Sequence, residues 1–251
     1  MQYTHLSESV EIKKISEKGN VGVFHVEGLY TGYGTTIGHA LRRVLLSSLP
    51  GAAITQIKIK GVNHEFSTLP GMMEDVVEFV LNLKRVKFHF FADEPQTLLL
   101  KVKGEEKITA GHIQSTPFAR VVNPEVHLAT LTKKNADLEV EVTVEKGLGY
   151  VPSETRRLER LLVGTIVLDA AFSPVERVSF EVENMRVGDR TDYNRLKIEV
   201  ETDGSITPSE AMHKAANILK DHFEKVLAVE ITPTALEDGG EKKKKEKKSK
   251  K

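Results

Sequence analysis

The segment that most constrains the fold of this chain runs from Thr207 to about Leu227. It opens with a capping box, Thr207-Pro208-Ser209-Glu210, in which proline takes the first helical position. An apolar stripe of helical spacing follows over about five turns. Its members are Met212, Ala215, Ala216, Leu219, Phe223, Val226 and Leu227. The pattern predicts a helix roughly 30 Å long, with small residues that permit close approach of another helix.

Two further segments predict helices. The first follows the glycine-rich turn at residues 32–34, where Thr35 or Thr36 can cap it, and it carries apolar residues at helical spacing as far as Leu49. Its apolar surface is wider than one packing contact needs. The second runs from about Glu74 to Arg85.

Much of the remaining chain alternates apolar and polar residues, the pattern of strands with one solvated face. The clearest runs cover residues 138–144, 178–182 and 196–200. Short strands fill the middle of the chain, whereas its two ends combine helix and strand signals. We therefore predict an α+β fold with three parts: a discontinuous domain of residues 1–51 and 173–236, an inserted mostly-β domain of residues 52–172, and a disordered lysine-rich tail of residues 237–251.

Composition and charge exclude several classes of protein. The 251 residues include no cysteine, so disulfides, thiolate zinc sites and cysteine nucleophiles are excluded. Neither a secretion signal nor a run long enough to span a membrane is visible, so we expect a cytoplasmic protein. The formal net charge of zero divides into +6 over residues 241–251 and −6 over residues 1–240. An acidic body argues against a domain that grips DNA through its own surface.

The segment from Gly32 to Gly38 resembles a phosphate-binding loop at the start of a helix. The third glycine comes one residue late for the dinucleotide fingerprint, and no Gly-Lys-Ser/Thr follows. A structural turn is therefore favoured. A small nucleotide-binding enzyme that uses this turn is the alternative function.

We find no catalytic constellation, metal site or cofactor motif in this chain. The pair His64-Glu65 lacks the second histidine of a zinc-protease helix, and the nine histidines are scattered along the sequence. This favours a structural or binding protein. The pair Arg42-Arg43 in the first predicted helix admits two interpretations, ordinary surface charges or an arginine bound at a protein interface.

Several segments together resemble the bacterial RNA polymerase alpha subunit family. The resemblance covers roughly residues 8–230, and its motifs occur in the order of the family. They are Gly34–Gly51, His64–Thr68, Glu74–Lys84, Gly147–Pro152, Ser173–Arg177, Val187–Asp192 and Thr202–Ile206.

The resemblance implies a subunit of DNA-directed RNA polymerase, the nucleotidyltransferase that makes RNA, without catalytic residues of its own. It implies an intertwined homodimer that scaffolds assembly, with two long helices on an antiparallel sheet packed across the dimer axis. One protomer would bind the beta subunit and the other beta-prime. Localisation would be cytoplasmic and associated with the nucleoid, with no membrane partner.

Three sets of contact residues follow from the same resemblance. The beta-facing set is Arg42, Arg43, Leu46, His64, Glu65, Phe66 and Ser67. The beta-prime-facing set is Lys84, Ser173, Pro174, Val175, Glu176 and Arg177. The dimer set is Tyr33, Ile37, Leu41, Leu219, Phe223 and Leu227. Arg43 matches the arginine most closely tied to beta binding.

The sequence departs from the family at its C-terminal end. Family members commonly continue into a small helical domain that binds promoter DNA, whereas this sequence ends in Lys242–Lys251. A natural lack of that domain and a truncated sequence both remain open. Direct DNA contact is expected at most as non-specific contact through the lysine tail, and a tail without a defined partner is equally compatible with the sequence.

Overall fold

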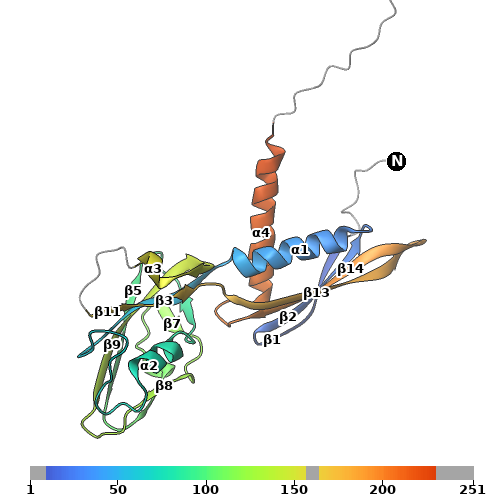
Figure 1. The fold of residues 1–251 in the computed structure, drawn as a ribbon. Helices are drawn as coiled ribbons and strands as arrows, with labels where there is room; N and C mark the ends of the chain where they lie inside the picture. The colour runs from blue at the N-terminus through green and yellow to red at the C-terminus, as the bar shows by residue number, and fades with distance from the viewer. Residues whose placement is uncertain (1–9, 157–163, 230–251) are drawn as a thin grey trace, which may run out of the picture.

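The computed structural model describes residues 10–156 and 164–229, which form two hydrophobic cores (Figure 1). One core takes residues up to Leu49 and from Val175 onward. The other takes residues between Ile54 and Leu168. The two ends of the chain therefore share one core and the middle of the chain builds the other. The predicted tail of residues 237–251 lies outside the described residues.

The core shared by the two chain ends rests on an antiparallel sheet in the order β1-β2-β14-β13. Its strands are β1 (Glu11–Lys18), β2 (Val21–Leu29), β13 (Val175–Val187) and β14 (Arg190–Thr202). Alternation explains which face is covered: Leu196, Ile198 and Val200 of β14 are buried, and polar residues stand between them. The strands predicted at 178–182 and 196–200 are confirmed.

Two helices, α1 (Tyr33–Ser47) and α4 (Pro208–Leu227), pack into this core with β2, β13 and β14. In Figure 1, α4 crosses α1 and continues well beyond the sheet. The predicted capping box is present, since the Thr207 side chain accepts a hydrogen bond from the backbone N–H of Glu210. Only the first turns of α4 are buried, through Ala211 and Ala215, whereas Leu227 near its end is 82% exposed.

The start of α1 differs from the prediction. Neither Thr35 nor Thr36 caps it; the N-cap is Gly32, in a left-handed conformation with φ of 89°. The helix begins at Tyr33, so both threonines lie within its first turn. A positive φ at the cap suits glycine, and the acceptor for the free N–H groups comes from another part of the chain, which local sequence does not reveal.

Two glycines let α1 lie close to the sheet. A Cβ at Gly34 would come 2.7 Å from Cγ1 of Val182, and a Cβ at Gly38 would come 2.7 Å from the ring of Phe180. Both contacts are shorter than any side chain tolerates. The two glycines are one turn apart and form the face of α1 that meets β13 and β14.

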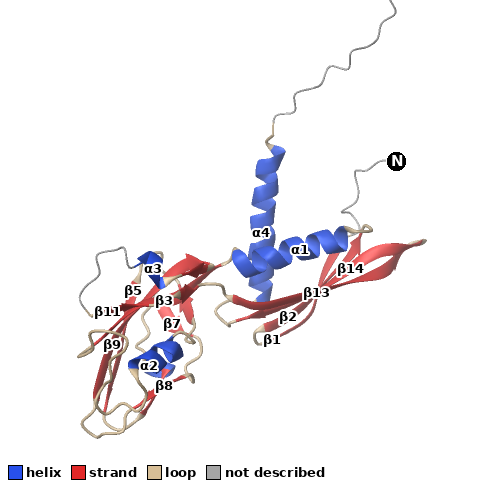
Figure 2. Cartoon of the chain, in the orientation of Figure 1, coloured by secondary structure: helices blue, strands red, loops and turns tan. Residues whose placement is uncertain are grey.

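The second core surrounds an antiparallel sheet in the order β11-β3-β9-β5. Figure 2 shows strands through most of this part, with α2 packed beside them. The larger elements are β3 (Pro50–Ile59), α2 (Val76–Leu83), β5 (Gln96–Lys103), β9 (Asp137–Leu148) and β11 (Thr165–Val167). The smaller ones are β4 (Phe88–Phe90), β6 (Lys107–Thr109), η2 (Ala110–His112), β7 (Ala119–Val121), β8 (His127–Thr130), β10 (Tyr150–Val151), α3 (Ser153–Arg156) and β12 (Ala170–Ala171).

The helix predicted at residues 74–85 is confirmed with narrower bounds. Asp75 caps α2, because its carboxylate accepts from the backbone N–H of Glu78 at 2.7 Å. Phe79 and Leu83 are fully buried on its inner face. The α+β class with antiparallel sheets is likewise confirmed. No helix within residues 10–156 and 164–229 is long and apolar enough to span a lipid bilayer.

Glu17 of β1 fastens the start of α4. Its carboxylate accepts from the backbone N–H of Ser209 at 3.0 Å and from the Ser209 hydroxyl at 2.8 Å. Lys14 lies 2.8 Å away on the same strand. The hydrogen bonds from Lys14 and Ser209 lower the pKa of Glu17 from 4.5 to about 2. An anion at a helix N-terminus is also favoured by the aligned peptide dipoles.

We predict that Gly38→Ala destabilises the protein by about 1–3 kcal/mol, because the added methyl group forces Phe180 or α1 to shift. Urea unfolding followed by circular dichroism measures this change. Thr35→Ala, on the exposed side of the same helix, is the matched control and should leave the midpoint nearly unchanged. Equal midpoints for the two variants would contradict the close approach of α1 to β13.

We predict that Glu17→Gln removes part of the acid dependence of stability. A carboxylate with a lowered pKa stabilises the fold above its unfolded pKa near 4.5, and this contribution is lost as the pH falls toward 2. Thermal unfolding between pH 5 and pH 2 should therefore show a shallower fall in melting temperature for Glu17→Gln than for the parent chain. Glu224→Gln, at the exposed far end of α4, should retain the parent slope.

Candidate functional site

The turn from Gly32 to Gly38 is closed to a phosphate group. The backbone N–H groups of Gly32 and Gly34 both donate to Oδ1 of Asn194, at 2.8 and 3.4 Å. Two of the N–H groups that a phosphate would use here are therefore occupied by a side chain. Gly34 and Gly38 serve packing against the sheet instead, which disfavours the nucleotide-binding alternative.

The α1 residues predicted to face beta are exposed. Arg42 and Arg43 are both solvent-exposed and adjacent on the helix, and Leu46 one turn on is 37% exposed. Among the described residues, neither arginine has a carboxylate within ion-pair distance. The exposed face of α1 thus presents two unpaired guanidinium groups beside an apolar side chain, a composition typical of protein-binding surfaces.

The other residues of the predicted beta-facing set lie in the loop between β3 and α2. The hydroxyl of Ser67 is 3.2 Å from Nδ1 of His64, and its backbone N–H donates to the carbonyl of His64, so the loop closes on itself. Phe66 is 79% exposed at its tip. A cavity of about 300 Å³ lies between residues 63–66 of this loop and β11. The beta-facing set therefore occupies two elements, one in each core.

A large apolar cavity lies between α1, α4, β1 and β2. Its volume is about 700 Å³, and it is lined by apolar residues that include Ile12, Phe24, Ile37, Leu41, Met212, Leu219 and Phe223. Four predicted dimer residues, Ile37, Leu41, Leu219 and Phe223, are brought together here. Leu41 is buried within its own chain, whereas Phe223 is 62% exposed.

Two predicted dimer residues lie away from the lining of this cavity. Tyr33 is 46% exposed at the start of α1 and makes an edge-to-face contact with Tyr30, with ring centroids 6.4 Å apart. Leu227 is exposed near the end of α4. The open apolar surface therefore extends along α4 past the end of the cavity.

Lys84, predicted to face beta-prime, is the C-cap residue of α2 and forms an ion pair with a carboxylate. Its Nζ is 3.1 Å from Oδ2 of Asp169, and the other oxygen of Asp169 accepts from the backbone N–H of Ser153 at 2.9 Å. These two hydrogen bonds lower the pKa of Asp169 to about 2. Lys84 therefore presents its charge from a fixed position.

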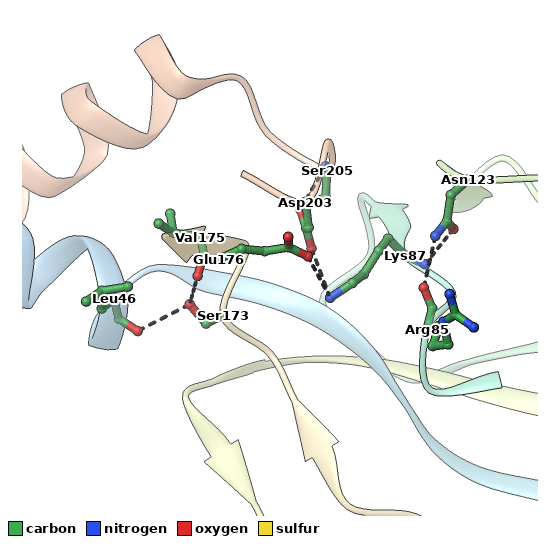
Figure 3. Close-up of polar contacts among 9 residues, drawn as sticks. All are labelled: Leu46, Arg85, Lys87, Asn123, Ser173, Val175, Glu176, Asp203 and Ser205. Carbon is green, nitrogen blue, oxygen red and sulfur yellow. Dashed lines mark hydrogen bonds and ion pairs between the residues drawn. The ribbon is translucent and has the colours of Figure 1, made fainter. Parts of the chain in front are cut away.

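The rest of the predicted beta-prime set enters β13, and much of it is already engaged within the chain (Figure 3). The Ser173 hydroxyl donates to the carbonyls of Leu46 and Val175 at 3.2 and 3.1 Å. Pro174 and Val175 are buried. Glu176 and Arg177 are exposed, so these two side chains are the accessible part of the segment.

Comparison with known proteins places the chain in a family. Residues 57–173 match the RNA polymerase Rpb3/RpoA insert domain. Over 228 residues the chain is 46% identical to the DNA-directed RNA polymerase subunit alpha of Symbiobacterium thermophilum, which covers 91% of this chain and 71% of that relative. The chain belongs to the DNA-directed RNA polymerase alpha subunit family. The same name is carried by relatives from Alkaliphilus oremlandii, 46% identical over 240 residues (93% of this chain, 75% of that relative), and Limosilactobacillus reuteri, 44% identical over 230 residues (91% and 72%).

The second core of this alpha subunit corresponds to the insert domain. The matched segment begins within β3 and ends just before β13, so it includes the residues of that core from Ile57 onward. The functional interpretation from sequence, an alpha subunit of DNA-directed RNA polymerase, is confirmed. The alignments with these relatives, over 228 and 240 residues, include both cores.

Sequence reasoning missed the polar contacts that join the two cores of this alpha subunit. Nζ of Lys87 lies 3.7 Å from Oδ2 of Asp203 and 4.0 Å from Oε1 of Glu176 (Figure 3). Nδ1 of His89 is 3.0 Å from the carbonyl oxygen of Ser205. Lys87 and His89 adjoin the second core, and the other three residues adjoin the first. No local pattern marks these contacts, because the partners lie far apart along the sequence.

We predict that Lys87→Met lowers the free energy of unfolding by about 1–2 kcal/mol, because Asp203 is largely buried and loses its cation. Its two hydrogen bonds from Ser205 remain and limit the loss. Urea unfolding measures the change.

Lys60→Met is the matched control. Its pair with Glu139 is on the surface, with the lysine side chain 69% exposed, so its loss should cost under about 0.5 kcal/mol. A Lys87→Met variant as stable as Lys60→Met would show that the junction does not depend on this pair.

Proposed function

We propose that this alpha subunit acts as a homodimeric, non-catalytic scaffold that brings together the beta and beta-prime subunits of RNA polymerase. Residues 1–51 and 173–236 would form the dimerisation domain and residues 52–172 the insert. The separation of the two hydrophobic cores supports this division, because each core is built almost entirely from residues of one part.

The observation that carries the homodimer is the bare apolar surface of α4. Beyond Leu219 the helix leaves its own core, and Phe223, Val226 and Leu227 are 62, 64 and 82% exposed. They continue the apolar stripe that lines the cavity next to α1. An exposed stripe continuous with an apolar cavity is typical of an association surface, and a second copy offers a complementary pair of the same features.

The large subunits would bind away from this surface. Arg42, Arg43 and Leu46 on α1, with the loop of His64–Ser67, would contact beta. Lys84, Glu176 and Arg177 would contact beta-prime. Exposure of most of these side chains supports both assignments, and the guanidinium groups of Arg42 and Arg43, which have no carboxylate partner among residues 10–156 and 164–229, suit a carboxylate-bearing partner. Residues 10–156 and 164–229 contain no group of three or more His, Asp or Glu able to hold a metal ion.

Capture of the tagged chain from its own cells tests the scaffold. Mass spectrometry should identify two large subunits, each at about one copy per two copies of this chain. Recovery of the chain alone under gentle conditions would overturn the proposal.

We predict that Arg43→Ala weakens capture of beta while the homodimer persists. Truncation of an arginine at the centre of an interface costs about 2 kcal/mol, or about 30-fold in Kd. Titration of beta against the immobilised dimer measures affinity, and light scattering measures the mass of the dimer.

Arg120→Ala serves as the control for this variant, because Arg120 is an exposed arginine on β7 outside the proposed contacts. Its affinity for beta should equal that of the parent chain. Loss of the dimer in Arg43→Ala would mean that this side chain belongs to the dimer surface instead.

A further inference from the structure

Helix α1 starts without a cap of its own. Its N-cap residue is glycine, no side chain of the first turn caps the free N–H groups, and the first turn contains no acidic residue. The free N–H groups of a helix start need acceptors when they are shielded from water. Gly34 is buried against the sheet, so its N–H group lies in that situation.

A row of polar residues on β14 supplies the missing contacts. Leu196, Ile198 and Val200 form the helix-facing row of this strand, and the same alternation continues through Asn194, Asp192 and Arg190. The row changes from apolar to polar where β14 reaches the start of α1. Each of the three polar residues contacts the segment Tyr30–Gly34.

Asp192 and Arg190 contact Thr31 and Tyr30, which precede the helix. The Thr31 hydroxyl is 2.8 Å from Oδ2 of Asp192 and donates to its carbonyl at 2.7 Å. The guanidinium of Arg190 pairs with Asp192 and lies 5.1 Å from the centre of the Tyr30 ring. The side chains of Arg190 and Asp192 are 48 and 49% exposed, so solvent can replace much of their contact at modest cost.

Asn194 differs because it is buried. It is 6% exposed, one of three buried polar residues in the described ranges. Its Oδ1 accepts from Gly32 and Gly34, and its Nδ2 donates to Oδ1 of Asn184 at 3.4 Å. The pairing of β14 with β2 shifts between Asn194 and Leu196. Such an irregularity re-aims side chains at the edge of a ladder.

We propose that Asn194 is the positioning residue of α1. Its side chain caps the helix from β14, and this contact sets where the helix begins and how it lies on the sheet. Arg43 is ten residues along α1, about 15 Å from its start. A helix released at its first turn can tilt on the sheet and displace the exposed face that carries Arg42 and Arg43. For its effect on beta binding, this inference rests on the scaffold function proposed above.

Substitutions at position 194 distinguish a hydrogen-bond acceptor from a residue that only fills space. An aspartate at this position keeps the acceptor, and its charge is favoured at a helix N-terminus. A leucine has a similar size and offers no acceptor, and an alanine removes the acceptor without adding bulk. Asn184→Leu removes the distal partner while leaving the contacts to Gly32 and Gly34 in place, which makes it the matched control.

Amide hydrogen exchange of the full chain tests the assignment directly. In Asn194→Leu and Asn194→Ala, exchange across residues 32–37 should rise roughly tenfold, whereas Asn194→Asp and Asn184→Leu should stay within about threefold of the parent chain. Equal exchange in Asn194→Ala and the parent overturns the proposal. So does a tenfold rise in Asn194→Asp, because the acceptor is retained there. If Asn194→Leu fails to fold, the alanine and aspartate variants decide.

Titration of beta against the same variants tests the functional consequence. Weaker binding by Asn194→Ala with parent affinity in Asn194→Asp supports positioning through α1, and parent affinity in Asn194→Ala overturns that part. If the parent chain itself captures neither large subunit, the scaffold function fails, while the exchange result still decides whether Asn194 positions the helix.

Discussion

The close approach of α1 to β13 and β14 is the contact on which the shared core depends. With no side chain at Gly34 or Gly38, the helix lies directly on the rows that contain Val182, Phe180 and Leu196. Helix and strands are separated by well over a hundred residues of sequence, so this contact also joins the two ends of the chain. With α1 in this position, its residues Ile37, Ala40 and Leu41 line the cavity beside α4. The exposed residues of α1 are thereby left free for a partner.

The two halves of α4 experience different surroundings. The first turns are fixed by the capping box, by Glu17 and by the burial of Ala211 and Ala215. In the second half, the residues beyond Leu219 are exposed, among them the apolar Phe223, Val226 and Leu227. A helix of this length gains most of its stability from packing of its apolar face. The bare half therefore fits a protein whose folding is completed by association, as the proposed homodimer requires.

The junction between the cores sets how the proposed partner surfaces are arranged. The proposed contact residues of α1 and β13 lie on the surface of the part that contains the shared core. The loop of His64–Ser67 and Lys84 lie on the surface of the insert. Their relative placement depends on two chain crossings and on a few polar contacts, among them Lys87 with Asp203 and His89 with Ser205. A partner that contacts both parts would bind a surface whose geometry is fixed by this small set of residues.

Local sequence by itself determined the helix at Thr207–Leu227, the helix near Glu74–Arg85 and the alternating strands, since capping residues and periodicity act within a few residues of the positions they specify. The ordered motifs determined the family. Tertiary structure alone decided that Asn194 rather than Thr35 or Thr36 caps α1, that Gly34 and Gly38 serve packing rather than phosphate binding, and that Glu17 and Lys87 find their partners far along the chain. The physical reason is distance in sequence: Gly32 and Asn194 are 162 positions apart, and only the register of β14 in the sheet brings them together.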